Sequence, residues 1–239
     1  MRKSTTNKIT AILTTIPARE NILSEVIGSI YNQVGSIRII FNGYSKVPDW
    51  VESKPKVKAW VDASNKDTDC AKWKVAPEEG YVFSIDDDIL YPKDYVSTLI
   101  EKIEQYSREC VVTVHGSYFK IPFLDFRKSK RCIHFTAESM KDVEVDLPGS
   151  ATLAYHVDTI KPRFEDFFAP SRSDIWFSAL CHKKKIPIIC IARKKNWLKL
   201  IPTKGLSIWR RTRIDKDFLQ KNTEYVAKYI IPYKELDKC

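Results

Sequence analysis

Short apolar runs alternate with amphipathic stretches along the first half of the chain. Between the runs, residues 18–33 and 93–106 carry apolar side chains at helical spacing and predict two helices. The alternation is typical of an α/β fold, so we expect a mostly parallel, Rossmann-like sheet flanked by helices. Five apolar runs predict the strands of this sheet, at residues 9–16, 37–41, 57–61, 81–85 and 110–114.

The second half of the chain has a different pattern. Residues 143–147 alternate between apolar and polar positions, Pro148-Gly149 predicts a turn, and an apolar run follows at 151–157. This order predicts an antiparallel excursion, either a hairpin or strands inserted into a mixed sheet.

A further helix and strand complete the second half. The helix is predicted from Asp174 to about residue 184, and the strand at residues 186–192. No linker separates the two halves, so we expect a single domain over residues 1–239. Its first half would extend to about residue 115, and its second half would begin at about residue 116 and include the C-terminal tail.

The composition is that of a folded globular protein, with 44% hydrophobic and 12% aromatic residues. No apolar run approaches the roughly 20 residues that span a bilayer, and the polar start MRKSTTNK is unlike a signal peptide. We therefore expect a cytoplasmic protein. The six cysteines contain no CxxC pair, which predicts reduced, structural thiols and no zinc site.

Positive charge gathers in the C-terminal part of the chain. The formal net charge is +10, and basic residues are frequent after position 181. Such a surface attracts a nucleic acid, an anionic membrane face or a phosphorylated ligand. A solvated lysine-rich face without a partner would give the same sequence pattern. The motifs of helix-turn-helix, zinc-finger and RNA-recognition proteins are missing, so we expect no nucleic-acid partner.

Three adjacent carboxylates, Asp86, Asp87 and Asp88, follow the strand predicted at 81–85. Like charges this close cost free energy unless a cation or hydrogen-bond donors compensate them. Thr14 and Asn42 come at the ends of two other predicted strands. Ligands of open α/β sheets bind beyond the carboxyl ends of the strands, which favours a binding site over a solvated acidic turn.

These residues also carry a resemblance. The segments TTIPAR, FNGY, DCAKW, VFSIDDDILYP and RSDIWFSAL, taken in order, resemble a GT-A glycosyltransferase of the family 2 or exostosin-like kind. The resemblance is clearest over residues 9–105 and returns at 145–192. Residues 116–142 and the tail beyond 200 match no pattern of that family.

The resemblance implies a donor site for a nucleotide sugar, expected to be a UDP-sugar, held through Mn²⁺ or Mg²⁺. By resemblance, Asp88 and Asp86 would ligate the cation, Asp86 would also face the ribose, and Asp87 would belong to the same donor-binding cluster. The remaining donor contacts would come from Thr14, Arg19, Asn42 and Lys72. Relatives often carry an arginine at the position of Lys72, and a lysine supplies a point charge without a bidentate fork.

Asp174 would be the catalytic base. In inverting relatives an acidic pair begins the helix that lines the acceptor pocket, and its second member deprotonates the attacking hydroxyl. Here the pair is Ser173-Asp174, so a single acid remains. A carboxylate in the first turn of a helix is also favoured by the helix dipole alone. His115 could approach the same site, but we expect a core histidine.

The tail segment TKGLSIWRRTR could close over the donor. Gly205 would be the hinge, Trp209 the apolar lid, and Arg210 and Arg211 would meet the departing diphosphate. The alternative is a basic patch in peripheral contact with anionic lipid at the inner face of the cytoplasmic membrane.

The expected activity is hexosyl or N-acetylhexosaminyl transfer, by inversion, to a glycan or lipid-linked acceptor such as a cell-surface polysaccharide or lipopolysaccharide. Two alternatives remain open. One is a basic nucleic-acid-binding protein, and the other is a nucleotidyltransferase, which generally has a glycine-rich loop after its first strand. TTIPAREN contains no glycine.

Overall fold

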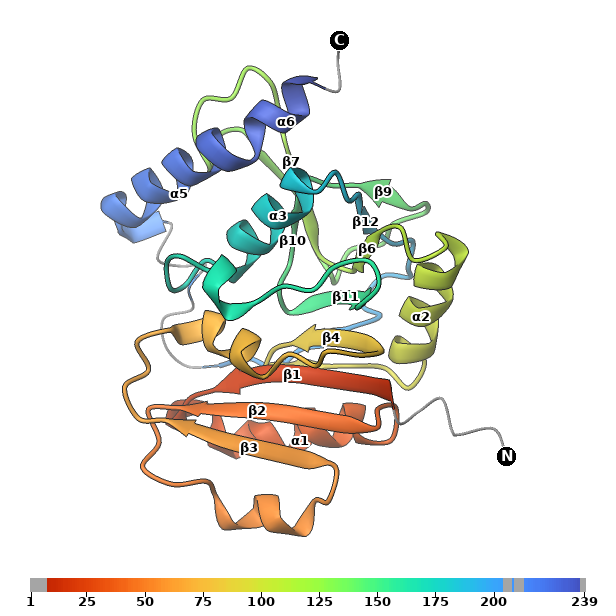
Figure 1. The fold of residues 1–239 in the computed structure, drawn as a ribbon, viewed down its shortest axis with the longest axis vertical. Coiled ribbons are helices and arrows are strands. Elements are labelled where there is room, and N and C mark those ends of the chain that lie inside the picture. The colour runs from red at the N-terminus through yellow and green to blue at the C-terminus, as the bar shows by residue number, and fades with distance from the viewer. Residues whose placement is uncertain (1–7, 204–207, 209–212, 237–239) are drawn as a thin grey trace.

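The computed structural model describes residues 8–203, 208 and 213–236 of the chain. Its main element is an eight-stranded sheet with the order β3-β2-β1-β4-β11-β6-β12-β9 (Figure 1). The strands are β1 (Ile9–Thr15), β2 (Ser36–Asn42), β3 (Val57–Asp62), β4 (Tyr81–Ile85), β6 (Val111–Thr113), β9 (Val143–Glu144), β11 (Thr152–His156) and β12 (Ile188–Cys190).

Most neighbours in this sheet are parallel. β1 pairs in parallel with β2 and β4, β2 with β3, and β6 with β12. β11 lies antiparallel between β4 and β6, and β9 is antiparallel to β12. The prediction of an α/β fold with a large, mostly parallel sheet flanked by helices is confirmed. All five strands predicted in the first half are present.

The three predicted helices are also present. They are α1 (Glu20–Tyr31), α2 (Tyr95–Gln105) and α3 (Ser173–Lys183). The first begins later than predicted, because Pro17–Arg19 form a separate 3-10 turn, η2, and Arg19 then leaves the helical region with φ −116° and ψ 5°. Three further 3-10 segments were not predicted: η3 (Asp49–Ser53), η4 (Thr68–Val75) and η5 (Phe164–Asp166).

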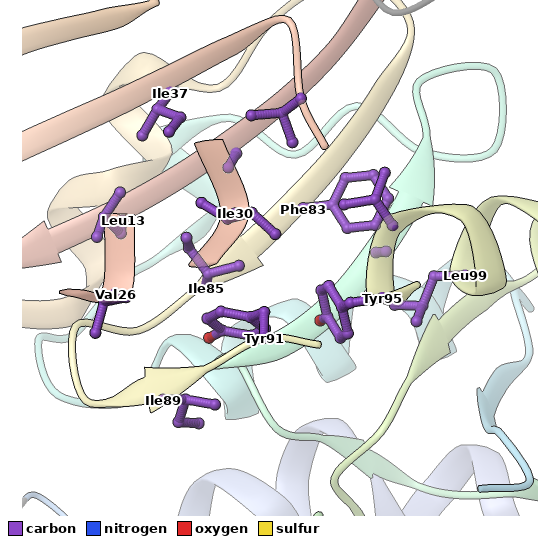
Figure 2. Close-up of a cluster of buried hydrophobic side chains, with 14 of the residues drawn as sticks. Leu13, Val26, Ile30, Ile37, Phe83, Ile85, Ile89, Tyr91, Tyr95 and Leu99 are labelled. Atoms are coloured by element: carbon purple, nitrogen blue, oxygen red, sulfur yellow. The ribbon is translucent and has the colours of Figure 1, made fainter. Parts of the chain in front are cut away.

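Apolar side chains cover both faces of the sheet. Adjacent residues of β1 show the alternation, since Leu13 packs with the cluster around α1 and α2, whereas Ile12 packs with the cluster around η4 and α3. Figure 2 shows the first cluster, in which Leu13 and Phe83 of the sheet lie among side chains of both helices. Strands buried on both faces explain why the sequence reads as continuous apolar runs.

Residues 143–147 do not form one continuous strand. This segment divides into β9 and a second short strand, β10 (Leu147–Pro148), which belongs to a different sheet. The division occurs because Val145 donates its N–H to Ile188, whereas the next residue, Asp146, donates to Ser117. No hairpin joins this segment to β11, so the alternative of strands inserted into a mixed sheet is the one that holds.

Two smaller sheets accompany the main sheet. β7 (Gly116–Phe119) and β8 (Lys130–Ile133) join β10 in a three-stranded sheet, and β5 (Ile89–Leu90) pairs with β13 (Lys199–Leu200). Two helices that were not predicted, α5 (Lys216–Tyr229) and α6 (Ile231–Leu236), lie at the opposite end of the molecule from β3 (Figure 1). Within the described residues, no helix combines the length and apolarity needed to cross a membrane.

Candidate active site

The strand order reverses between β1 and β4. The chain leaves β1 toward β2 and β3 on one side, while β4 lies on the other side of β1. Such a switch point in a parallel sheet opens a crevice at the carboxyl ends of the strands, where ligands of this fold class bind. Figure 1 shows that β1, β2 and β3 all end at the same edge of the sheet. Arg19 follows β1 at this edge, and the aspartate triplet follows β4.

Arg19 contacts two of the three aspartates. Its Nη1 donates a hydrogen bond to Asp87 Oδ1 and lies 3.0 Å from Asp88 Oδ2. The three side chains differ in exposure, with 20% for Arg19, 17% for Asp88 and 5% for Asp87. Residues 68 positions apart therefore form one partly buried ion-pair cluster at the switch point.

Lys72 holds the third aspartate. Its side chain is fully buried, and its Nζ lies 3.0 Å from Asp86 Oδ1. The same ammonium group donates to the backbone oxygens of Ile85, at 3.2 Å, and Ser150, at 3.3 Å. A buried lysine needs this degree of compensation. Lys72 therefore fixes the end of β4 against the segment that leads into β11.

Tyr91 connects the backbone of the triplet to the protein core by hydrogen bonds. The N–H of Asp86 donates to Tyr91 Oη at 3.0 Å, and the Tyr91 hydroxyl donates to the Ala151 carbonyl at 2.8 Å. Tyr91 is 3% exposed, and its ring packs against Tyr95, as Figure 2 shows. The backbone on which the triplet sits is therefore anchored in the apolar core.

The cluster is acidic even with both cations in place. Three carboxylates face one guanidinium and one ammonium, which leaves a formal charge of −1 when all five groups are ionised. Burial alone would lower the pKa of Arg19, but the carboxylates of Asp87 and Asp88 raise it above its usual value. Burial and the charge of Asp86 raise the pKa of Asp88 to about 7 despite its contact with Arg19. The cluster is poised to accept a further positive charge.

Thr14 and Asn42 lie at the same edge of the sheet. Thr14 is half-buried near the end of β1. Asn42, at the end of β2, is 1% exposed, and its Nδ2 donates to the Thr68 carbonyl at 2.8 Å. Thr68 is the first residue of η4. Asn42 therefore positions η4, which also carries Lys72.

Asp174 lies in the first turn of α3, as predicted, and its Oδ1 accepts the N–H of Ile175 at 2.9 Å. Burial raises its pKa, with Lys130 opposing and Asp69 adding to the shift. Asp69 belongs to η4 and accepts the Ser173 N–H at 3.1 Å. Both Asp69 and Asp174 therefore accept a backbone N–H in the first turn of α3. Because η4 carries Asp69 and also Lys72, it connects this acidic pair to the triplet.

No protein-family model and no curated protein matches this chain. The assignment of a function therefore rests on the arrangement of the residues.

Asp69 and Tyr91 are the functional candidates that the sequence did not reveal. In the sequence, Asp69 stood out only as part of the segment DCAKW. Asp69 and Lys72 are three residues apart, and in a 3-10 helix residues i and i+3 lie on the same face. The role of Tyr91 can be recognised only when the structure shows that residues 81–91 are mostly buried and that its hydroxyl reaches Asp86.

Other predictions fall elsewhere. His115 does not contact the triplet; it packs against His134 and Phe135, and its Nε2 lies 3.5 Å from Cys132 Sγ. Gly205, Trp209, Arg210 and Arg211 lie outside the described residues. Four of the described cysteines are buried and one is exposed.

The residues fit a hard divalent cation by their chemistry. The ion pairs with Lys72 and Arg19 use Asp86 Oδ1 and Asp88 Oδ2, so each carboxylate has a second oxygen outside these pairs. Within the described part of the chain, no group of three or more His, Cys, Asp or Glu side chains is arranged to hold a metal by itself. Two carboxylates can hold Mg²⁺ when substrate phosphates and water supply the other oxygens.

Proposed function

We propose that the protein is a metal-dependent glycosyltransferase of the GT-A type that uses a nucleotide-sugar donor, in the first place a UDP-sugar. The observation that carries the proposal is the aspartate triplet at the β1/β4 switch point, compensated by Arg19 and Lys72 and left with a formal negative charge. A nucleoside diphosphate and a divalent cation together match this site in charge and in position.

Asp86 and Asp88 would hold Mn²⁺ or Mg²⁺. When bound, the cation would neutralise the negative charge that grows on the diphosphate as the glycosidic bond breaks. Lys72 keeps Asp86 in place by pairing with Oδ1, and Arg19 presents a guanidinium group at the mouth of the site. Asp87 is too buried to meet a ligand easily, and it serves to orient Arg19.

Asp174 would take the proton of the acceptor hydroxyl. A general base works best when its pKa lies near the working pH, and burial next to Asp69 raises the pKa of this carboxyl in that direction. The start of α3 therefore supports an acceptor site beside the donor site. A single carboxylate base at this position is consistent with transfer by a single displacement with inversion. We propose a glycan or lipid-linked molecule as the acceptor.

The decisive experiment measures the stabilisation of the protein by UDP, with and without Mn²⁺, in a thermal-shift assay. We expect UDP to raise the melting temperature more with Mn²⁺ than with EDTA. Asp88→Asn should remove most of the metal-dependent part, because the amide keeps the shape and loses the charge. The matched control is Asp158→Asn, at the far end of the sheet with a side chain that is 66% exposed, which should behave as wild type.

Transfer itself is tested with radiolabelled UDP-sugars and a panel of lipid-linked acceptors. Asp174→Asn should keep UDP binding and lose transfer by about 10² to 10⁴, the usual effect of a positioned base. Near-normal turnover in this variant would reduce Asp174 to a helix-terminal carboxylate. Release of pyrophosphate in place of UDP would identify a nucleotidyltransferase and contradict the proposal.

A further inference from the structure

Arg19 already contacts Asp88, the residue that is expected to bind the cation. A single nitrogen, Nη1, contacts both Asp87 Oδ1 and Asp88 Oδ2. The two carboxylates differ, since Asp87 is 5% exposed at the bottom of the cluster and Asp88 is 17% exposed nearer its mouth. Arg19 therefore has one contact at the base of the site and one at its opening.

A divalent cation and Arg19 compete for Asp88. A divalent cation bound to Asp88 would place its two positive charges against the carboxylate that Arg19 already contacts. A guanidinium at 3.0 Å from Asp88 Oδ2 would then be repelled by the cation and would share its ligand. The contact between Arg19 and Asp87 is not subject to this competition, because Asp87 faces the buried side.

The charges of the site also favour an exchange. With all five groups ionised, the cluster has a formal charge of −1, and one divalent cation would change it to +1. The diphosphate of a sugar nucleotide carries two negative charges and would bring the total back to −1. The site therefore reaches the same charge in its empty and fully loaded forms, and the half-loaded form with a cation alone has an excess of positive charge beside Arg19.

We propose that Arg19 is an internal counter-ion of the cation site. It holds Asp88 before the donor binds, releases Asp88 to the divalent cation, and turns on its Asp87 contact to meet the donor diphosphate. Arg19 is thus a positioning residue that couples the binding of cation and diphosphate. This inference rests on the proposed function.

The coupling has a measurable consequence. In the wild-type protein, the cation binds weakly alone, because it must displace Arg19, and more tightly with a diphosphate that accepts the released guanidinium. Linkage requires the diphosphate to gain the same factor from the cation. Removal of Arg19 should increase the affinity for the cation alone and reduce the coupling.

The experiment is a calorimetric titration of wild type, Arg19→Gln and Arg108→Gln with Mn²⁺, in the absence and presence of UDP. Arg19→Gln should bind Mn²⁺ alone about tenfold more tightly, which corresponds to the loss of one charge-assisted contact that the cation must break. The factor by which UDP improves Mn²⁺ binding should decrease in the same variant. Arg108 pairs with Glu104 and Asp158 away from the triplet, so Arg108→Gln removes an equal charge and should leave both values unchanged.

The outcomes separate the inference from the function. If wild type binds Mn²⁺ and UDP with coupling, but Arg19→Gln binds Mn²⁺ no better, the counter-ion role is wrong and the proposed function stands. If wild type shows no metal-dependent UDP binding, the proposed function fails, and the inference fails with it. Should Arg19→Gln not fold, Arg19→Met provides the same test, since it also removes the positive charge and keeps a long side chain. An affinity of Arg19→Met for Mn²⁺ at or below that of wild type would also overturn the inference.

Discussion

At the scale of single residues, His115 shows how a predicted candidate can serve the fold rather than the site. Burial, with the nearby charges of Lys130, His134 and Arg193, lowers the pKa of His115 to about 3. His115 also packs so closely against Gly149 that a Cβ at position 149 would lie 2.7 Å from the Cβ of His115. Neutral His115 is thus part of the packing below β7 and β10.

The pH dependence of stability follows from this lowered pKa. The unfolded chain takes up the proton near pH 6.5 and the folded protein near pH 3, so His115 stabilises the fold above pH 6.5 and this contribution is lost as the pH falls toward 3. We expect the difference in unfolding free energy between wild type and His115→Gln to shrink by about 1–2 kcal/mol between pH 7 and pH 5.

Urea denaturation at a series of pH values measures this difference. His134 and His156, whose pKa values are also lowered by burial, are present in both proteins, so the difference between the two proteins reports mainly on His115. A difference that stays constant over this pH range would show that His115 titrates normally in the folded protein.

At the scale of elements, η4 connects the parts of the site. Asn42 holds its first residue, Asp69 accepts the N–H at the start of α3, and Lys72 binds the end of β4. Trp73 anchors the opposite side of η4. Its ring stacks on the rings of Phe167 and Phe177, with distances of 4.8 and 5.2 Å between ring centroids. One short 3-10 element therefore sets the positions of both the aspartate triplet and the acidic pair Asp69 and Asp174.

We expect Lys72→Met to destabilise the protein by about 1–3 kcal/mol, because three acceptors lose their charged donor. The loss stays below that of a fully buried pair, since Asp86 is 37% exposed and can be hydrated. Lys74→Met is the matched control. Lys74 is 33% exposed and pairs with Asp62 and Asp67, so its loss should cost less than about 1 kcal/mol. Equal midpoints of urea unfolding for the two variants would contradict the anchoring role of Lys72.

The elements also show what the sequence could and could not predict. The strands of the first half and the helices α1, α2 and α3 were predictable, because burial on both faces produces apolar runs and burial on one face produces helical spacing, whereas α5 was not predicted. η4 was not predictable, since eight residues of 3-10 helix with Trp73 and Lys72 both buried follow no simple period. The sequence predicted that Asp86–Asp88 belong to the site, because they follow a strand. Their contact with Arg19 could not be predicted, because it depends on the order of the strands in the sheet.

At the scale of the whole molecule, one sheet runs through both halves of the sequence. β11 comes from the second half, yet it pairs with β4 along five residues and also pairs with β6. The first half alone therefore lacks the strand at the centre of its sheet. Ser150 and Ala151, just before β11, also accept the hydrogen bonds of Lys72 and Tyr91.

This arrangement predicts that a fragment of residues 1–115 does not fold cooperatively. A fragment of residues 1–203 keeps all eight strands and should still unfold in one transition, at a lower temperature, because Trp176 loses its contacts with Tyr225 and Tyr229. Circular dichroism during heating distinguishes the two fragments. A sharp transition for residues 1–115 would show that the first half is an independent folding unit.

The position of β11 also has a consequence for biosynthesis. β6 ends at Thr113 and β11 begins at Thr152, so a ribosome delivers both flanking strands before the one that joins them. At about 5–20 residues per second, the gap stays open for a few seconds. During this time the apolar strand β4 presents an unpaired edge to other nascent chains. The period of greatest exposure to aggregation is therefore expected during translation, and a chaperone that shields residues 81–85 would act before the chain is complete.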